Sequence, residues 1–274
     1  MRTFFLAIVS LCVTIAANAF TIKEVNVFSE SMKKDVPVTV VFPDDYDSEK
    51  LFPVVYLLHG YSDNYKTWTE RTDVEELSDL YKVIIVMPDG GHSSWYFDSP
   101  FVPDYQYETF VSAELVNYID SNFKTIKDRS GRAITGLSMG GHGALHTAFK
   151  HQEVFGSAGS TSGGVDFRPF PTKWHIAARI GSYEEYPDNW EKSTVINLTH
   201  LLTPGSLNII IDCGVDDFFY GVNCNLHEKL LKEGIPHDFY TRPGGHNWAY
   251  WGNSIKYQML FFDACFGKIN SNES

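Results

Sequence analysis

A glycine-flanked serine turn constrains the fold of this chain more than any other feature. Residues 136–140 read Gly-Leu-Ser-Met-Gly, follow a short apolar run at 133–135 and open a helical pattern at 141–150. A sharp turn from strand to helix needs glycines beside its serine, because the two elements approach too closely for larger side chains. Two further glycines early in the helical pattern favour such a turn over an ordinary glycine-rich loop. The Ser138 hydroxyl is then exposed above a sheet, at a helix N-terminus whose dipole favours a developing negative charge.

The remaining hydrophobic pattern predicts an α/β fold. Short, nearly continuous apolar runs are typical of parallel strands buried on both faces, and they occur at residues 54–58, 83–87, 133–135 and 207–211. Segments 21–28 and 36–42 alternate instead and predict an antiparallel hairpin at the sheet edge. Helical patterns accompany the later runs, at residues 108–123, 226–232 and 255–262. We therefore expect a mostly parallel, doubly wound sheet with a leading antiparallel hairpin, and a small cap region formed by residues 165–204.

The 274-residue chain has no internal repeat or linker-like tract, so residues 20–270 are expected to form a single domain. Its 22 Lys and Arg against 34 Asp and Glu give a net charge of −12. A nucleic-acid-binding protein needs a basic surface, and the composition therefore argues against that class.

The first 19 residues are typical of a secretory signal peptide. Arg2 supplies a positive start, an apolar run follows at 4–17, and Ala17-Asn18-Ala19 supplies a small-residue cleavage site. The run is too short for a comfortable membrane span, and no later stretch reaches its length. Cleavage near Ala19 predicts export to the periplasm or the extracellular medium.

Cleavage leaves three cysteines, Cys213, Cys224 and Cys265. An odd number in a large domain argues against a disulfide framework. Two interpretations are equally open at this stage. Cys213 and Cys224 form one bridge in an oxidising compartment, or all three thiols are buried and pack as small hydrophobic side chains.

A serine needs a base to become a nucleophile, and the base needs an acid to orient it. In a fold of this kind the acid and then the histidine follow the serine along the chain. His246 lies in Pro-Gly-Gly-His-Asn-Trp, after a predicted strand at 237–241, on a loop that can reach back over the sheet. Asp216 and Asp217 lie on the loop after the 207–211 run. We favour Asp217 as the acid, with Asp216 as the alternative.

Two backbone N–H groups must stabilise the oxyanion that forms when such a serine attacks a carbonyl. One is the N–H of Met139, the residue after the serine. The second should come from the loop after an earlier strand. Leu-Leu-His-Gly-Tyr at 57–61 fits, because its glycine allows the sharp turn that points the Tyr61 N–H inward. No His, Cys, Asp or Glu cluster has metal-ligand spacing and no glycine-rich phosphate loop follows the first strands, so we expect neither a metal nor a cofactor.

The segments LLHG, GLSMGGHGAL, CGVDDFFY and PGGHNWAYW together resemble the esterase D-type branch of the α/β-hydrolase superfamily. That branch includes the feruloyl and acetylxylan esterases of carbohydrate esterase family 1, tributyrin esterases and S-formylglutathione hydrolases. The resemblance spans residues 54–262 and implies the α/β-hydrolase fold. It also implies a nucleophile, acid and base at Ser138, Asp217 and His246, and oxyanion donors at Met139 and Tyr61.

The aromatic residues after the 83–87 strand suggest what the site binds. Trp95 and Tyr96 lie on the same sheet edge as the catalytic loops, and together with Trp248 we expect them to bind an aromatic acyl group or sugar rings. Trp68, Trp174 and Trp190 either add rings to such a surface or pack the cap against the sheet.

Export disfavours glutathione thioesters, which are cytosolic substrates. We therefore expect a serine carboxylesterase that hydrolyses feruloyl or acetyl esters on plant cell-wall polysaccharide such as arabinoxylan. The alternatives are a general short-chain acyl esterase of the tributyrin or acetyl-ester type, an acyltransferase with a sugar hydroxyl as acceptor, and a non-catalytic carbohydrate-binding scaffold.

Overall fold

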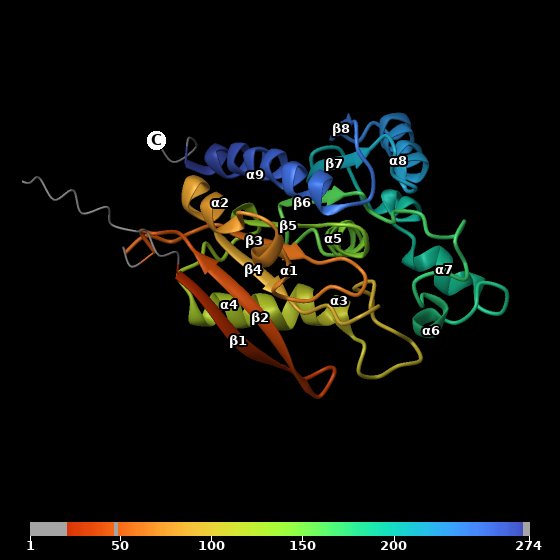
Figure 1. Ribbon diagram of the computed structural model, residues 1–274, viewed down its shortest axis with the longest axis horizontal. Helices are drawn as coiled ribbons and strands as arrows, with labels where there is room; N and C mark the ends of the chain where they lie inside the picture. Colours follow the sequence, from red (N-terminus) through yellow and green to blue (C-terminus); the bar gives the residue numbers. More distant parts are fainter. Residues whose placement is uncertain (1–20, 47–48, 271–274) are drawn as a thin grey trace, which may run out of the picture.

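The computed structural model describes residues 21–46 and 49–270, so the predicted signal peptide lies outside the described residues. Within them, eight strands form one sheet in the order β1-β2-β4-β3-β5-β6-β7-β8 (Figure 1). The strands are β1 Thr21–Ser29, β2 Lys34–Phe42, β3 Val54–Leu58, β4 Ile84–Pro88, β5 Arg132–Gly136, β6 Ser157–Thr161, β7 Asn208–Gly214 and β8 Asp238–Arg242. The pairs β1·β2 and β2·β4 are antiparallel, and every later pair in this order is parallel.

Helices cover both faces of this sheet. They are α1 Thr67–Arg71, α2 Val74–Tyr81, α3 Tyr107–Thr109, α4 Leu115–Asn122, α5 Met139–Lys150, α6 Ala177–Ile180, α7 Pro187–Ser193, α8 Tyr220–Lys232 and α9 Trp248–Asn270. Helices α1, α2 and α9 pack on one face, and α4, α5 and α8 pack on the other together with the cap. The strands show this division in alternate residues: Tyr56 of β3 belongs to the second face and Leu57 to the first. The predicted hairpin, the mostly parallel sheet and the α/β fold class are confirmed.

Strand β6 was not expected from the sequence, because Ser-Ala-Gly-Ser-Thr contains no bulky apolar residue. The strand is nevertheless fully buried. Its residues are small because helices approach closely: a Cβ on Gly159 would lie 2.3 Å from Oε1 of Gln258 in α9. Tight packing of neighbouring elements, rather than side-chain hydrophobicity, therefore selects this sequence.

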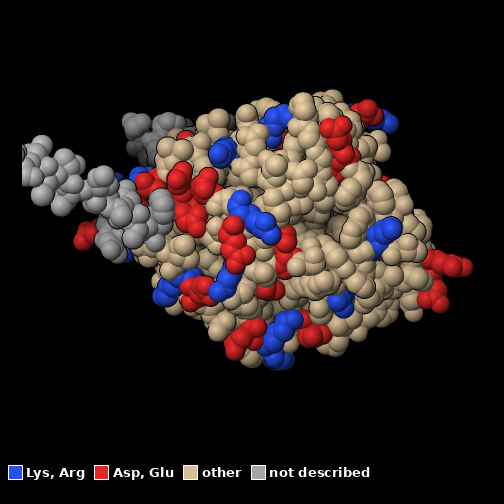
Figure 2. Space-filling view, in the orientation of Figure 1, with Lys and Arg blue, Asp and Glu red and all other residues tan. Residues whose placement is uncertain are grey.

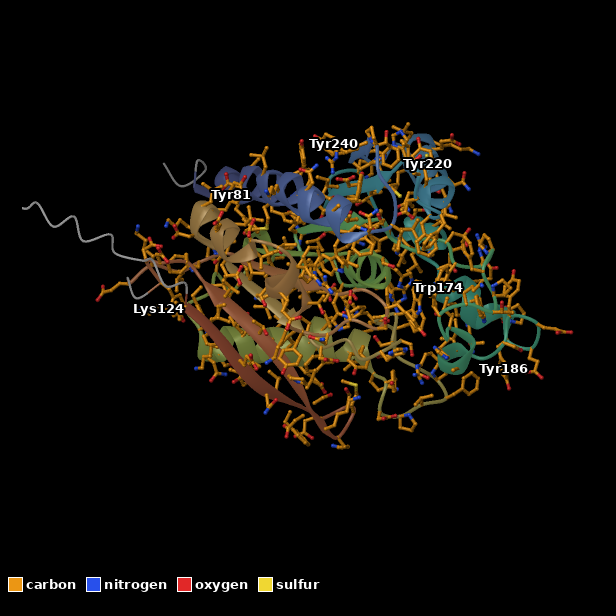
Figure 3. All side chains as sticks on the ribbon, viewed as in Figure 1. Tyr81, Lys124, Trp174, Tyr186, Tyr220 and Tyr240 are labelled. Atoms are coloured by element: carbon orange, nitrogen blue, oxygen red, sulfur yellow. The ribbon has the colours of Figure 1, made fainter. Side chains whose placement is uncertain are left out.

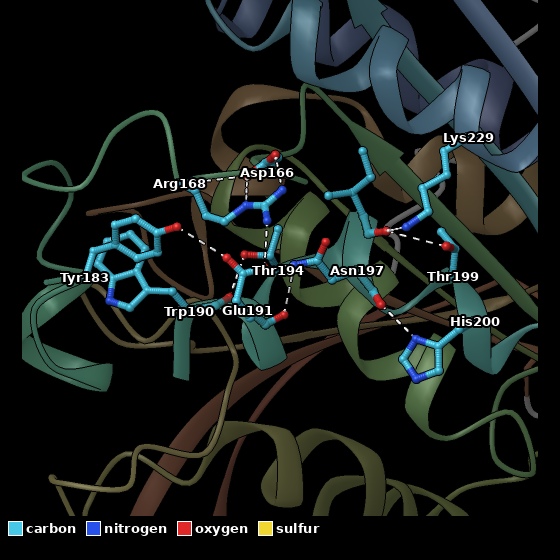
Figure 4. A network of polar contacts seen from close by, with 11 residues as sticks. Asp166, Arg168, Tyr183, Trp190, Glu191, Thr194, Asn197, Thr199, His200 and Lys229 are labelled. Atoms are coloured by element: carbon cyan, nitrogen blue, oxygen red, sulfur yellow. Dashed lines mark hydrogen bonds and ion pairs between the residues drawn. The ribbon is translucent and has the colours of Figure 1, made fainter. Parts of the chain in front are cut away.

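The cap lies at one end of the molecule and contains α6, α7 and two short 3₁₀ turns, Val195–Asn197 and Thr199–Leu201 (Figure 1). A polar network holds it together (Figure 4). The Arg168 guanidinium bonds Asp166 at 2.8 Å and Glu191 at 2.7 Å, and the Asn197 amide donates to Glu191 at 2.6 Å. Lys229 of α8 donates to the Ile196 carbonyl at 2.7 Å and ties the cap to the core.

In the face shown in Figure 2, acidic and basic side chains are interspersed around a broad uncharged area. No helix in the described part of the chain is long and apolar enough to span a membrane. Cys213 and Cys224 are not bonded to each other, so the predicted bridge is absent from this structure. The alternative of three buried thiols holds only for Cys213, because Cys224 and Cys265 are half-buried.

Candidate active site

Ser138 lies at the turn between β5 and α5 with φ 54° and ψ −115°, a conformation that residues with side chains rarely adopt. The glycines on either side make this turn possible. A Cβ on Gly140 would lie 2.4 Å from the Leu58 carbonyl oxygen, and one on Gly136 would lie 2.6 Å from the same atom. The strained turn predicted from the sequence is therefore present, and it leaves Ser138 8% exposed.

The structure brings Ser138, His246 and Asp217 into one hydrogen-bonded chain. His246 Nε2 lies 2.9 Å from Ser138 Oγ, and His246 Nδ1 lies 2.8 Å from Asp217 Oδ2. Because a carboxylate only accepts, Nδ1 carries the proton and Nε2 is free to accept from the serine hydroxyl. Asp217 is buried and also accepts the Phe219 N–H at 2.8 Å, whereas Asp216 is exposed. Between the two candidate acids, the structure places Asp217 against the histidine.

The two loops that carry Asp217 and His246 leave neighbouring parallel strands, β7 and β8. Backbone bonds join them directly: the Asp216 N–H donates to the Gly244 carbonyl at 2.9 Å. Beneath them, the fully buried Asp212 carboxylate is bonded by Arg242, Tyr250 and Ser254. Sequence reasoning gave Asp212 no role beyond its strand position. Its partners come from β8 and α9, and only the tertiary fold reveals them.

The two expected oxyanion donors belong to the two segments that meet at Ser138, helix α5 and the turn after β3. Met139 is the first residue of α5, and the first N–H groups of a helix have no partner within it. Tyr61 follows Gly60, whose Cβ would lie 3.6 Å from the Cβ of Ser138. In this turn the Ser62 N–H donates to the His92 carbonyl and the Asp63 N–H donates to the Gly60 carbonyl. None of the backbone bonds described for this turn uses the Tyr61 N–H.

A cavity of about 260 Å³ opens beside Ser138 and His246. Aromatic rings form most of its wall, and its lining residues are Gly60, Tyr61, Asp63, Leu137, Ser138, Trp174, Phe218, His246 and Trp251. Trp174 lies where the cap meets the core (Figure 3) and stacks on Phe218 with ring centroids 5.7 Å apart. Burial raises the pKa of Asp63. The cavity wall is therefore largely aromatic, and its polar side chains are those of Tyr61, Asp63, Ser138 and His246.

The structure corrects the substrate-binding prediction for Trp95 and Tyr96. Their side chains are 1% and 0% exposed, and neither lines the cavity. The Trp95 ring packs on His142 and Phe167 beneath the cap, and the Tyr96 hydroxyl accepts the His59 N–H at 3.2 Å. Both residues have left-handed φ angles, 54° and 58°, and their side chains fill the interior.

Trp248 is half-buried and does not line the cavity either, because it packs edge-on against Trp68 and Trp251. Trp251, one turn later on α9, takes the place beside His246 with ring centroids 4.9 Å apart. Phe218 and Trp251 are the aromatic wall residues that sequence reasoning missed. The signal for Phe218 was its position directly after Asp217, on a loop that had to reach the site. Trp68 and Trp190 are buried packing residues.

The buried Cys213 thiol of β7 is unsuited to act as a nucleophile. Burial raises the pKa of the Cys213 thiol, which keeps it protonated. In the residues that the structure describes, no group of three or more His, Cys, Asp or Glu side chains could hold a metal ion.

A mostly parallel sheet that presents a serine on a left-handed turn into the next helix defines the α/β-hydrolase class. The chain belongs to the Esterase family, whose family model matches residues 29–262. This confirms the resemblance that the four sequence segments indicate.

Individual relatives agree with this assignment. An acetyl esterase from Caldicellulosiruptor saccharolyticus is 30% identical over 255 residues, which are 85% of this chain and 95% of that protein. An esterase of Mycobacterium tuberculosis is 34% identical over 237 residues, 76% of this chain, and the chain spans only 52% of its length. A solved ferulic acid esterase superposes with a TM-score of 0.78 at 28% identity, covering 90% of this chain and 98% of that one.

Proposed function

We propose that this protein is an exported serine carboxylesterase that hydrolyses feruloyl or acetyl esters on plant cell-wall polysaccharide. The observation that carries the proposal is the hydrogen-bonded chain from Asp217 through His246 to Ser138 at the wall of an aromatic cavity. Export rests on the signal-peptide pattern of residues 1–19.

The proposed mechanism has two acyl-transfer steps. His246 Nε2 takes the proton of Ser138 as Oγ attacks the ester carbonyl, and Asp217 stabilises the imidazolium that forms. The negative charge on the carbonyl oxygen is stabilised by the N–H groups of Met139 and Tyr61. The alcohol then leaves with the proton from His246, and an acyl group remains on Ser138. A water molecule gives its proton to His246 and attacks this acyl-enzyme, which releases the acid and restores the serine.

The cavity wall supports an ester with a flat or small acyl group. The rings of Phe218 and Trp251 pack on the His246 imidazole, and Trp174 stacks on Phe218. An aromatic acyl group stacked on such rings gains roughly 0.5–1.5 kcal/mol beyond its burial. The names of two relatives, a ferulic acid esterase and an acetyl esterase, point to the same two acyl groups.

A substrate panel tests the proposal. Initial rates would be compared on p-nitrophenyl acetate, methyl ferulate, acetylated xylan and tributyrin, with and without a sugar whose hydroxyl groups compete with water as acceptor. We expect hydrolysis of methyl ferulate or acetylated xylan at higher kcat/KM than tributyrin. Turnover of tributyrin alone would contradict the cell-wall substrate and support the alternative of a general short-chain esterase. Acyl transfer to the sugar in preference to water would replace hydrolysis with an acyltransferase reaction.

A further inference from the structure

Three rings from three separate segments meet at the rim of the cavity. Tyr61 comes from the turn after β3, His92 from the loop after β4, and His175 from the cap just before α6. The Tyr61 hydroxyl lies 2.6 Å from His175 Nδ1 and 3.1 Å from His92 Nε2. The Tyr61 ring also packs on both imidazoles, with centroids 4.7 Å from His92 and 5.9 Å from His175. The Tyr61 side chain is therefore held between the loop that carries His92 and the cap.

The hydrogen atoms of this cluster can satisfy both contacts at once. The Tyr61 hydroxyl has one proton to donate and lone pairs to accept with. It donates to His175 Nδ1 when that imidazole carries its proton on Nε2, and it accepts from His92 when Nε2 of that ring is protonated. The Ser62 N–H also donates to the His92 carbonyl at 2.9 Å, so the main chain links the same two loops.

The cap contributes two successive residues to this region. Trp174 and His175 have φ angles of 53° and 56°, and such conformations persist in bulky residues only where the surroundings hold them. Trp174 lines the cavity and His175 bonds Tyr61. The same two-residue turn therefore places one wall of the cavity and one restraint on the Tyr61 loop.

We propose that His92 and His175 are positioning residues that fix Tyr61, so that its N–H faces the oxyanion and the cap is coupled to this donor. The inference rests on the proposed function, because it needs the Tyr61 N–H to act on the reacting carbonyl. A donor held in place stabilises the transition state more than the bound substrate. Loss of the restraint therefore lowers kcat and leaves KM nearly unchanged.

The test uses Tyr61→Phe and His175→Phe, which remove the Tyr61–His175 hydrogen bond from either side and keep a ring. Tyr61→Phe also removes the contact with His92. We expect each to lower kcat on p-nitrophenyl acetate by about tenfold, a part of the 10²–10³ lost with a whole oxyanion donor. The double variant should be no slower than Tyr61→Phe alone, because Tyr61→Phe already removes the bond that His175→Phe removes. His175→Gln, which restores an acceptor, should recover part of the loss. The rate of Ser138 labelling by a fluorophosphonate should fall by the same factor as kcat.

His200→Phe is the matched control, since His200 is an exposed cap histidine bonded only to the nearby Asn197 carbonyl in the described contacts. Its kcat should stay within twofold of wild type. Unchanged kcat in folded Tyr61→Phe, losses that multiply in the double variant, or a loss confined to KM would overturn this inference and leave the proposed function intact. Wild-type protein that neither turns over esters nor reacts with the fluorophosphonate would overturn the proposed function, and this inference with it. If His175→Phe does not fold, Tyr61→Phe decides alone.

Discussion

Ser138 combines a strained backbone conformation with a hydroxyl that is nearly enclosed. Backbone angles of this kind cost on the order of 1–3 kcal/mol and persist only where the surrounding structure fixes them. Here the close approach of Gly136 and Gly140 to the end of β3 does so. Strain at the residue that would attack the substrate is consistent with a site arranged for chemistry rather than for stability.

Ser138→Ala should reduce kcat on p-nitrophenyl acetate by at least about 10³-fold, because the attacking oxygen is removed while the rest of the site remains. The small side chain contributes little packing, so the thermal midpoint should stay within about 2 °C of wild type. A variant that folds normally and retains more than about one per cent of wild-type turnover would contradict the assignment of the nucleophile.

Asp217→Asn should cost on the order of 10³–10⁴ in kcat, because an amide at this position no longer selects the His246 tautomer that accepts from the serine. Asp216→Asn is the matched control, since this neighbouring carboxylate is exposed and should change kcat less than twofold. The pair is compared under saturating substrate at pH 7.5. Equal losses in both variants would mean that the acid loop, and not one carboxylate, matters.

At the scale of elements, some aromatic residues near the cap pack in the interior and others line the cavity. Trp95 follows β4 but turns inward under the cap, and a Cβ on Gly164 would lie 2.6 Å from its ring. Trp174 belongs to the cap and lines the cavity. Position after a strand at the catalytic edge is therefore not enough to make a residue part of the site.

Trp95→Ala should lower the free energy of unfolding by about 3–5 kcal/mol, the usual cost of removing a buried indole, and it should reduce activity on all esters alike. Trp174→Ala should leave stability within about 1 kcal/mol, because its ring is only half-buried. It should instead lower kcat/KM on methyl ferulate several-fold more than on p-nitrophenyl acetate. Urea unfolding and the two esters measure both effects. Selective loss of ferulate hydrolysis in Trp95→Ala would reverse this interpretation.

At the scale of the whole molecule, buried histidines make stability depend on pH. His142 of α5 is fully buried between the Trp95 and Ser193 carbonyls, and burial lowers its pKa to about 4 against the opposing effect of these two contacts. Burial also holds the pKa of His146, which stacks on it, well below the usual value. The folded pKa lies below the unfolded one, so the unfolded state binds more protons as the pH falls.

The free energy of unfolding should therefore fall by about 2 kcal/mol between pH 7 and pH 5 through His142 alone, with His146 acting in the same direction. Urea unfolding of wild type and His142→Gln at both pH values measures this, and the variant should lose less on acidification even if it is less stable at pH 7. An identical pH dependence in the two proteins would show that His142 does not supply the effect. Glu108, whose pKa is lowered to about 2 because His151, His146 and Lys150 outweigh its burial, contributes only at lower pH.

Much of this molecule is determined by local sequence. The hairpin, the continuous apolar strands and the glycines around Ser138 act within a few residues, where hydrophobic period and steric limits decide the conformation. Ser138, Asp217 and His246 each follow a predicted strand, and the carboxyl ends of parallel strands meet at one sheet edge, so their loops are expected to converge. These features could be predicted without knowing the contacts between distant segments of the chain.

Tertiary structure alone decided the features that depend on approach between distant segments. The side chains of β6 are small because helices pack closely on both of its faces, and Trp95 is buried because the cap covers it. Asp217 rather than Asp216 meets His246 because the β7 and β8 loops are bonded to each other in one register. The Tyr61, His92 and His175 cluster joins residues up to 114 positions apart. A single sequence carries no record of such distances, because contacts of this kind are set by how whole layers pack and not by the residues beside each group in the chain.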